Sequence, residues 1–335
     1  MNILLIGNYR EEVGGISGQM ALLQKHLRAE GHTADIFSTK GSVLHRLLAP
    51  IRLSARAKQY DVVHIHCCSN WGFLPAVVGI MAARGKGPRI VLTYHGGGAE
   101  KFFAKHPKLV TRWLRRTDQN IVLSGFLAQV FDKHQIPYAV IPNIIELDGS
   151  HYRQRAPLQP HFICTRAHEA IYNIPCILRA FRQVQQQLPS ATLTLVGDGT
   201  ERASLEALAD QMGLHNVTFT GRVPNNEIYA HLDQADILLS SPTVDNMPVS
   251  LLEAMNAGLL VISSRVGGVP YIVRNGRNGL LFESDNDHEL ATKMLWSIQN
   301  QTVAQAIVRQ AQKTVDQYHW EHIRTEIYKA YGTTA

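Results

Sequence analysis

Short apolar runs alternate with longer stretches of helical spacing along the chain, and this alternation restricts the fold more than any other feature of the sequence. Asn2–Gly7 is an apolar run that ends in glycine, as is typical of a buried parallel strand. Ser17–Gly31 follows, with Met20, Leu23 and Leu27 on one face of a helix. Repetition of this strand and helix predicts a parallel sheet wrapped by helices.

The alternation runs through the first 123 residues and restarts after residue 160. The further strands predicted in the first half are Ala34–Ser38, Asp61–Ile65, Arg89–Thr93 and Asn120–Leu123. Those predicted in the second half are His161–Thr165, Ala191–Val196, Asn216–Thr220, Ile237–Ser240 and Leu259–Ser263, with helices over Pro175–Gln187, Glu201–Met212, Glu227–Gln234 and Val249–Ala257. The fold class is therefore predicted to be α/β, with two doubly wound domains facing a central cleft. Ligands of such sheets bind at the carboxyl ends of the strands.

Composition places the division between these domains. Residues 143–160 are polar and hold Gly149, Pro157 and Pro160, so we interpret them as the linker. We predict an N-terminal domain over residues 1–150 and a C-terminal domain over residues 151–315. Residues 316–335 carry aromatic and apolar side chains at helical spacing, among them Trp320 and Ile323, and are predicted to form a docking helix.

Several membrane and secretion signals are missing from the sequence. No stretch approaches the roughly 20 apolar residues that a membrane helix needs. The first seven residues are too short and uncharged to resemble a signal peptide. The four cysteines, at positions 67, 68, 164 and 176, form no C-x-x-C pair. We therefore expect a cytoplasmic protein.

The net charge of +6 is unevenly distributed along the chain. Residues 1–150 hold 18 Lys and Arg against 10 Asp and Glu, whereas residues 151–335 hold 15 against 17. A basic front half indicates an anionic partner. Cations interleave with apolar residues at Arg46, Arg52, Arg56 and Lys58, and again at Lys101, Lys105, Lys108, Arg112, Arg115 and Arg116. These stretches predict two amphipathic helices, with either solvated faces or a face that docks on an anionic membrane surface. No nucleic-acid partner is expected, since no such module is recognised.

Glycines and carboxylates mark the candidate ligand sites. Gly14 and Gly15 precede the first predicted helix, where backbone amides favour anions, although a plain turn is the alternative. Asp245 lies before the helix over Val249–Ala257, and Glu253 lies within it among apolar residues. Ionised carboxylates could accept hydrogen bonds from the hydroxyls of a sugar and a ribose; a capping Asp and a solvated Glu are the alternative.

The order of several motifs in the second half resembles the nucleotide-sugar-binding domain of the family 4 retaining glycosyltransferases. That family has the GT-B fold, with two Rossmann-like domains. The resemblance is strong over residues 161–297 and weak in the first half, where Gly14–Gly15, His95 and Ile141–Asn143 carry it. The matching motifs are Leu195–Gly199, Phe219–Val223, Ala235–Pro242, Asp245–Met255, Gly267–Pro270 and Asn278–Leu281.

The resemblance implies roles for the two carboxylates and for the loop between them. Asp245 would contact hydroxyls of the donor sugar, and Glu253 would hold the nucleotide ribose. The backbone of the loop at Asn246, Met247 and Pro248 would assist, with Pro248 donating no amide. The family usually has Glu at the first position, so Asp245 is a departure with a shorter side chain.

The resemblance also implies how the diphosphate and the base are bound. Arg166 matches the arginine that the family places on the donor diphosphate, but the lysine expected five residues later falls on Ile171. Arg166, the Gly14–Gly15 amides and Tyr172 would then share the neutralisation of the diphosphate. Val223 would offer backbone hydrogen bonds to the nucleobase.

His95 follows the strand Arg89–Thr93 and matches the histidine that the family often places near the donor sugar. No nucleophile and base pair accompanies it. This suits the retaining chemistry proposed for the family, in which the leaving phosphate assists attack from the same face. The cluster His64–Cys68 resembles a metal site, but we interpret it as a polar strand end and expect no metal and no cofactor.

We therefore predict a metal-independent retaining hexosyltransferase or N-acetylhexosaminyltransferase. It would use a UDP-sugar, or next a GDP-sugar, and a glycan or lipid-linked glycan acceptor in surface polysaccharide or glycoconjugate biosynthesis. We expect it in the cytoplasm, peripheral on the inner face of the cytoplasmic membrane. The alternatives are a non-catalytic GT-B nucleotide- or glycan-binding protein, a UDP-sugar epimerase and, third, a dinucleotide oxidoreductase. The donor sugar, acceptor, linkage and oligomeric state stay open.

Overall fold

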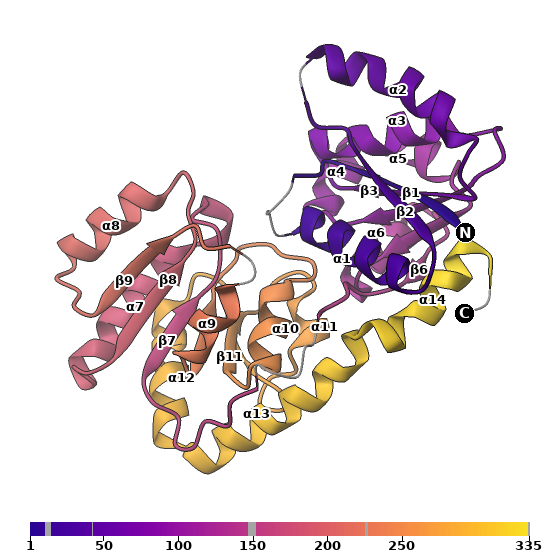
Figure 1. Cartoon of the computed structure of the whole chain (residues 1–335). Coiled ribbons are helices and arrows are strands. Elements are labelled where there is room, and N and C mark those ends of the chain that lie inside the picture. Colours follow the sequence, from indigo (N-terminus) through magenta and orange to yellow (C-terminus); the bar gives the residue numbers. More distant parts are fainter. Residues whose placement is uncertain (11–14, 42, 147–151, 225–226, 334–335) are drawn as a thin grey trace. The chain divides into compact units, whose positions relative to one another are not determined.

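The chain folds into two compact units, each built around its own six-stranded sheet (Figure 1). A computed structural model describes residues 1–10, 15–41, 43–146, 152–224 and 227–333, with residues 43–49 described by their backbone alone. One unit comprises Met1–Glu146 together with Tyr318–Ala335, and the other comprises Leu147–Gln317. The predicted divisions were at residues 150 and 315.

The N-terminal unit has a sheet of strand order β2-β1-β3-β4-β5-β6, and every pair of neighbours is parallel. Its strands are β1 (Asn2–Gly7), β2 (Thr33–Ser38), β3 (Val62–Cys67), β4 (Arg89–Tyr94), β5 (Gln119–Val122) and β6 (Ala139–Val140). Its helices are α1 (Ile16–Ala29), α2 (Val43–Ala57), α3 (Leu74–Ala83), α4 (Ala99–Lys105), α5 (Pro107–Leu114), α6 (Gly125–Lys133) and α14 (Trp320–Tyr331). Short 3-10 turns cover Asn70–Phe73 and Asp316–Tyr318.

The C-terminal unit has the strand order β12-β11-β10-β7-β8-β9, again parallel throughout. Its strands are β7 (His161–Cys164), β8 (Thr192–Val196), β9 (Val217–Gly221), β10 (Ile237–Ser240), β11 (Leu260–Ser264) and β12 (Leu280–Phe282). Its helices are α7 (Ile174–Gln187), α8 (Arg202–Gln211), α9 (Ile228–Asp233), α10 (Val249–Asn256), α11 (Val269–Ile272), α12 (Asp287–Gln299) and α13 (Gln301–Val315). A 3-10 turn over Ala170–Tyr172 precedes α7.

The predicted α/β class and the two doubly wound sheets are confirmed. The sequence prediction missed two edge strands, β6 and β12, of two and three residues. Runs this short show no measurable period, so alternation could not reveal them. They become strands because a longer neighbour, β5 or β11, offers its backbone groups for pairing.

The single helix expected over the second basic stretch is wrong. The chain forms α4 and α5 instead, separated at His106. Pro107 explains the break, because proline has no N–H to donate into a preceding turn and is favoured at the first position of a helix.

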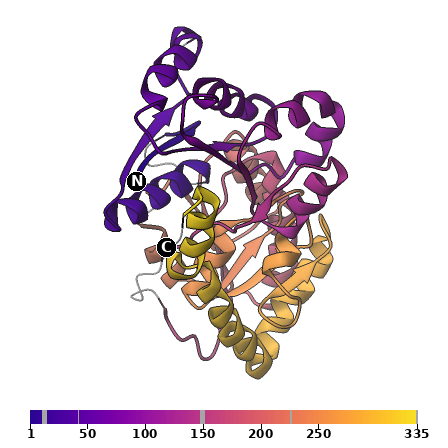
Figure 2. The same ribbon diagram turned by 90° about the vertical axis from the view of Figure 1, so that its right-hand side faces the viewer.

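Successive side chains of β1 point to opposite faces of the sheet, so the N-terminal unit has two hydrophobic clusters, one on each face. Leu4 and Ile6 belong to a cluster with residues of α2 to α6, whereas Ile3 and Leu5 belong to a cluster with residues of α1 and α14. The C-terminal helix therefore covers one face of the first sheet and lies beside α1 (Figure 2). The rings of His26 and Trp320 stack there, with centroids 5.1 Å apart.

Arg155 is the polar centre of the C-terminal unit. Its side chain is fully buried, and its guanidinium donates to the carbonyl oxygens of Ala235 at 2.6 Å, of Leu232 at 2.9 Å, and of Ala257. Nε also lies 3.4 Å from the carboxylate of Asp236. One side chain thus ties the segment before β7 to the segments that enter β10 and β11.

Three histidines form a polar cluster in the N-terminal unit, in which His64 and His66 are buried and His95 is half-buried. The Nδ1 atom of His64 lies 2.9 Å from the hydroxyl of Tyr331 in α14, and its Nε2 lies 2.7 Å from the hydroxyl of Thr93. The Nδ1 atom of His66 lies 3.0 Å from Nε2 of His95. Burial lowers the pKa of His64 and of His95 to about 3, and it lowers the pKa of His66 well below its usual value.

Replacing Arg155 with methionine should destabilise the C-terminal unit by about 3 kcal/mol or more, because several buried carbonyl groups lose their donor. Urea unfolding measures this change in the free energy of unfolding. Arg277→Met removes an exposed arginine of the same unit and should change that free energy by at most about 0.5 kcal/mol. Equal effects of the two substitutions would contradict the role given to Arg155.

The histidine cluster predicts that acid destabilises the N-terminal unit. The folded pKa values lie below the unfolded value of 6.5, so the stabilisation is complete above pH 6.5 and is lost as the pH falls toward 3. At about pH 5.5 each such histidine should cost about 1.4 kcal/mol. The variant His64→Gln/His66→Gln should unfold with a smaller pH dependence. The exposed His215→Gln control should keep the dependence of the parent protein.

Candidate functional site

The carboxyl ends of the second sheet bring four chain segments together. Because all strands are parallel, β7, β8, β10 and β11 end at the same edge. Residues 165–173 follow β7, residues 197–201 follow β8, residues 241–248 follow β10 and residues 265–268 follow β11. A loop cluster of this kind is where open α/β sheets bind their ligands.

Arg166 and Asp245 meet in this loop cluster. A terminal nitrogen of the Arg166 guanidinium contacts the carboxylate of Asp245, and the other donates to the Ser250 hydroxyl at 3.1 Å. Both charged side chains are largely buried, with 12% and 16% of their surfaces exposed. The structure therefore brings together the residue predicted for the diphosphate and the residue predicted for the sugar. Sequence reasoning did not single out Ser250, which lies in the first turn of α10.

The ring of Tyr172 lies against the same guanidinium, with the arginine carbon 4.0 Å from the ring centroid. The 3-10 turn Ala170–Tyr172 is held in place by hydrogen bonds to the segment after β10. The Ser241 hydroxyl is 2.9 Å from the carbonyl oxygen of Tyr172, and the amide of Thr243 donates to the carbonyl of Ile171 at 2.9 Å. Ile171 itself is exposed. Tyr172, rather than Ile171, is therefore the residue that contacts the charged centre.

The Asp245 loop is fixed by its own backbone and by the glycines after β11. The Asp245 carboxylate accepts from the amide of Asn246 at 2.8 Å, and its carbonyl accepts from the amide of Gly268 at 3.0 Å. A Cβ atom on Gly267 would lie 2.0 Å from that carbonyl oxygen, and its φ of +48° also favours glycine. Asn246 and Met247 are buried, and Pro248 is the N-cap of α10.

Glu253 lies on α10, partly buried among apolar neighbours such as Leu251 and Leu252. Burial raises the pKa of Glu253 to about 7, against an opposing effect of the Arg166 charge. The side chain therefore changes its charge near neutral pH. A hydroxyl-rich ligand that donates to the ionised form would hold the charge on this carboxylate.

Val223 lies two residues beyond β9. Because β9 pairs with β8 in parallel, Val223 follows the carboxyl end of β9, as the loops of the cluster follow the ends of their strands. Gly221, with a φ of +77°, turns the chain there, and its carbonyl accepts from the amide of Gly197 at 3.0 Å. The structure thus joins the loop that carries Val223 to the loop after β8.

His168 is a feature of this edge that sequence reasoning missed. It is fully buried, and neither ring nitrogen has a hydrogen-bond partner within the part of the chain that the structure describes. Its ring meets that of Phe219 edge to face, with centroids 5.9 Å apart. A Cβ atom on Gly199 would lie 2.4 Å from the His168 carbonyl oxygen, which explains one glycine of the Gly197–Gly199 turn. No sequence pattern distinguishes a buried histidine from a solvated one.

The remaining predicted site residues lie in the N-terminal unit. His95 follows β4, and its ring stacks on that of His66 with centroids 5.2 Å apart. Gly15 is the residue before α1 and has a φ of +65°, a conformation that favours glycine. Gly14 lies outside the described residues. Among those that are described, no group of three or more His, Cys, Asp or Glu side chains is arranged to hold a metal ion.

Family models match both units. One, described as glycosyl transferases group 1, matches residues 159–314, and another, described as glycosyltransferase family 4, matches residues 39–148. Together they leave unmatched the first 38 residues, the linker and the end of the chain.

Two curated relatives match a little under half of the chain. Sulfoquinovosyl transferase SQD2 of Arabidopsis thaliana is 27% identical over 153 residues, which are 45% of this chain and 29% of that protein. The amylovoran biosynthesis glycosyltransferase AmsK of Erwinia amylovora is 33% identical over 153 residues, which are 44% of this chain and 38% of that protein. The chain thus spans about a third of the length of the curated relatives that it matches.

Solved structures match the chain over nearly its whole length. Sucrose-phosphate synthase from Thermosynechococcus elongatus has a TM-score of 0.81 at 20% identity and covers 99% of this chain, with 98% of that chain matched. Anabaena HepE in complex with UDP-glucose has a TM-score of 0.81 at 18% identity, with 99% of both chains matched. At this identity the likeness shows the fold, which is GT-B as predicted. Since the two family models together match most of the chain, the chain belongs to glycosyltransferase family 4.

Proposed function

We propose that the protein is a retaining glycosyltransferase that takes its sugar from a UDP-sugar, or next a GDP-sugar. The observation that carries this proposal is the contact between Arg166 and Asp245. Glu253 lies on α10, the helix that follows Asp245. A cation for a diphosphate and two carboxylates for hydroxyl groups are the chemistry that a nucleotide-sugar requires. They lie at the sheet edge where such ligands bind.

In the proposed reaction, the bond between the anomeric carbon and the donor diphosphate oxygen breaks as the acceptor hydroxyl attacks that carbon from the same face. The electron pair of the broken bond stays on the diphosphate, and the acceptor proton passes to the departing phosphate oxygen. Negative charge therefore grows beside Arg166. Preorganised cations and dipoles at such a position stabilise the transition state.

The family pattern places a lysine at position 171, where this chain has Ile171. The next residue, Tyr172, supports Arg166 instead. The ring holds the guanidinium plane while Ser250 and Asp245 hold its two terminal nitrogens. A cation over an aromatic face gains about 0.5–2 kcal/mol. We propose that this fixed arginine binds the diphosphate with help from Gly14 and Gly15, and that Asp245 turns toward the sugar hydroxyls once the diphosphate shares its cation.

The other predicted residues complete the proposal. Val223 would bind the nucleobase through its backbone. Asn246, Met247 and Pro248 would shape the sugar pocket, and His95 would contact the donor sugar from the N-terminal unit. No metal and no cofactor is required in this scheme, and the sugar would be a hexose or an N-acetylhexosamine.

The acceptor and the location are proposed from the relatives and from charge. AmsK is named for amylovoran biosynthesis and a Salmonella typhimurium relative, WcaL, for colanic acid biosynthesis, so we propose a glycan or lipid-linked glycan acceptor. The basic residues of α2, α4 and α5 favour a cytoplasmic enzyme at an anionic membrane surface. The Arg46 side chain of α2 lies outside the described residues. Among the helices that are described, none is both long and apolar enough to cross a membrane.

A thermal-shift panel with UDP, GDP, ADP, CMP and NAD, each with and without magnesium, tests the proposed donor. A nucleotide at about 100 times its dissociation constant should stabilise the protein by about 2.7 kcal/mol. We expect a selective shift with UDP, equal with and without magnesium. A shift with NAD alone would favour an oxidoreductase. No shift with any nucleotide would favour a non-catalytic protein, and a new UDP-sugar formed without acceptor would identify an epimerase.

Substitution of the two carboxylates separates their proposed roles. Glu253→Ala should weaken UDP binding about tenfold or more, since a charged hydrogen-bond acceptor is lost. Asp245→Ala should mainly reduce turnover, by about a hundredfold. Titration calorimetry with UDP and hydrolysis of the UDP-sugar measure the two effects. The exposed Glu283→Ala control should change neither. Full affinity and full rate in both site variants would contradict the assignment.

The raised pKa of Glu253 predicts the pH dependence of binding. The carboxylate is ionised above pH 7 and protonated below it. UDP should therefore bind about tenfold more weakly at about pH 6 than at about pH 8. Glu253→Gln, which cannot ionise, should flatten this dependence. A parent protein whose affinity does not change across this range would show that the ionised carboxylate does not hold the ribose.

A further inference from the structure

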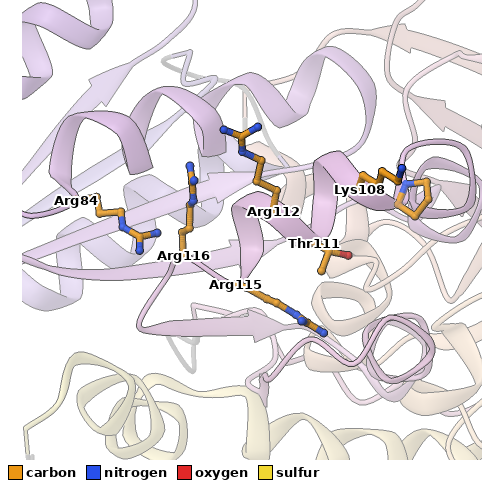
Figure 3. Close-up of a pocket in the computed structure, with 7 residues that line it drawn as sticks. Arg84, Lys108, Thr111, Arg112, Arg115 and Arg116 are labelled. Atoms are coloured by element: carbon orange, nitrogen blue, oxygen red, sulfur yellow. The ribbon is translucent and has the colours of Figure 1, made fainter.

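The N-terminal unit has a shallow groove of about 620 Å³ that is lined by cations. Arg84 approaches it from the end of α3, and the other lining residues come from α5 and the two residues after it. We call it the α5 groove. Its lining residues are Arg84, Pro107, Lys108, Thr111, Arg112, Arg115 and Arg116 (Figure 3).

The α5 groove is separate from the proposed active site. Arg84 precedes β4, and Arg116 precedes β5, so the groove lies toward the amino ends of these parallel strands. His95 follows the carboxyl end of β4. A strand of six residues spans about 20 Å. Arg84 and Arg116 therefore lie toward the opposite edge of the sheet from His95.

The cations are arranged to act together. Lys108 and Arg112 lie four residues apart on α5, a spacing that places side chains on one side of a helix, and Arg116 lies in the turn after the helix. Figure 3 shows Arg84, Arg116 and Arg112 in one part of the view and Lys108 at the opposite end, while Arg115 extends away from them. Arg115 donates to the carbonyl of Gln135 at 3.1 Å. The guanidinium of Arg116 lies 5.0 Å from the ring centroid of Trp113, which limits its freedom.

Within the described part of the chain, Arg84, Lys108, Arg112 and Arg116 form no ion pair. The acids that flank this stretch in the sequence are Glu100 and Asp118. Glu100 pairs with Lys133, and the carboxylate of Asp118 accepts from the amide of Ile90 at 2.7 Å. Like charges four residues apart on a helix destabilise it by about 0.2–0.5 kcal/mol per pair. The arrangement therefore costs stability in the unliganded protein.

Helix dipoles offset part of the charge but not most of it. The carboxyl ends of α3 and α5 both lie near these residues, and each carries about half a negative elementary charge. Two such ends cancel about one of the five positive charges. Asp118 adds one nearby negative charge, so about three positive charges remain, and they would attract an anion.

We propose that the α5 groove binds phosphate groups, at least two at a time, supplied either by the headgroups of anionic lipids or by a soluble diphosphate. Guanidinium groups bind phosphate oxygens through paired N–H donors, and the arginines here carry them. The hydroxyl of Thr111 adds a neutral donor. Leu109, which is 42% exposed on the same helix, offers an apolar contact that suits the lipid source. The lipid source deepens the membrane location proposed above and rests on it, whereas phosphate binding itself does not depend on the transferase activity.

Two binding measurements with the full chain test the site and distinguish the sources. Co-sedimentation with vesicles of phosphatidylcholine and phosphatidylglycerol in equal parts, against vesicles of phosphatidylcholine alone, reports lipid binding. Calorimetry with pyrophosphate reports soluble binding. The test variant is Lys108→Gln/Arg112→Gln. The matched control is Arg309→Gln/Lys313→Gln, which removes the same two charges at the same spacing from exposed positions of α13.

The test variant should bind the favoured ligand about fivefold more weakly for each charge removed, whereas the control should bind as the parent does. Loss of vesicle binding supports the lipid source, and loss of pyrophosphate binding with no vesicle binding supports the soluble source. Binding of neither ligand by the parent, or equal losses in both variants, would overturn the proposal. The UDP-induced thermal shift should persist in the test variant, which verifies its folding and separates this result from the donor site.

Discussion

Parallel pairing of every strand is the constraint from which the rest of this molecule follows. A parallel strand cannot be reached by a tight turn, so each connection must cross the sheet, and helices provide most of these crossings. All carboxyl ends of a sheet then meet at one edge. Residues 166, 198, 245 and 268 lie far apart in the sequence, yet each follows a strand of the second sheet and they share that edge.

The same geometry fixes the charged centre of the loop cluster. Tyr172 lies with its ring against Arg166, and bonds from Ser241 and Thr243 hold the turn over Ala170–Tyr172 in place. Asp245 reaches the same guanidinium from the loop after β10, where Gly267 lets the loop after β11 approach closely. Each contact depends on where the parallel strands end.

Most of the strands, most of the helices and the proximity of Arg166 to Asp245 could be predicted, because buried strands and motif order leave clear marks in a sequence. The roles of Arg166, Asp245 and Glu253 stay predictions. Contacts that depend on tertiary placement could not. Arg155 reads as one arginine of a polar linker, yet it lies at the centre of a buried hydrogen-bond network. His168 reads as a loop histidine, yet it is fully buried. Pro107 could have signalled the break between α4 and α5. The apolar and basic residues continue at helical spacing on both sides of it, and they favoured a single helix.

The return of α14 to the first unit has a consequence for biosynthesis. Ile3, Val91 and Ile121 lie on the face of the first sheet that this helix covers, but the helix is translated after the whole second unit. During synthesis the early sheet must therefore wait with one apolar face incompletely covered while the ribosome makes about half of the chain. The second unit can complete its own core first, so the earlier unit of the sequence is the later one to mature.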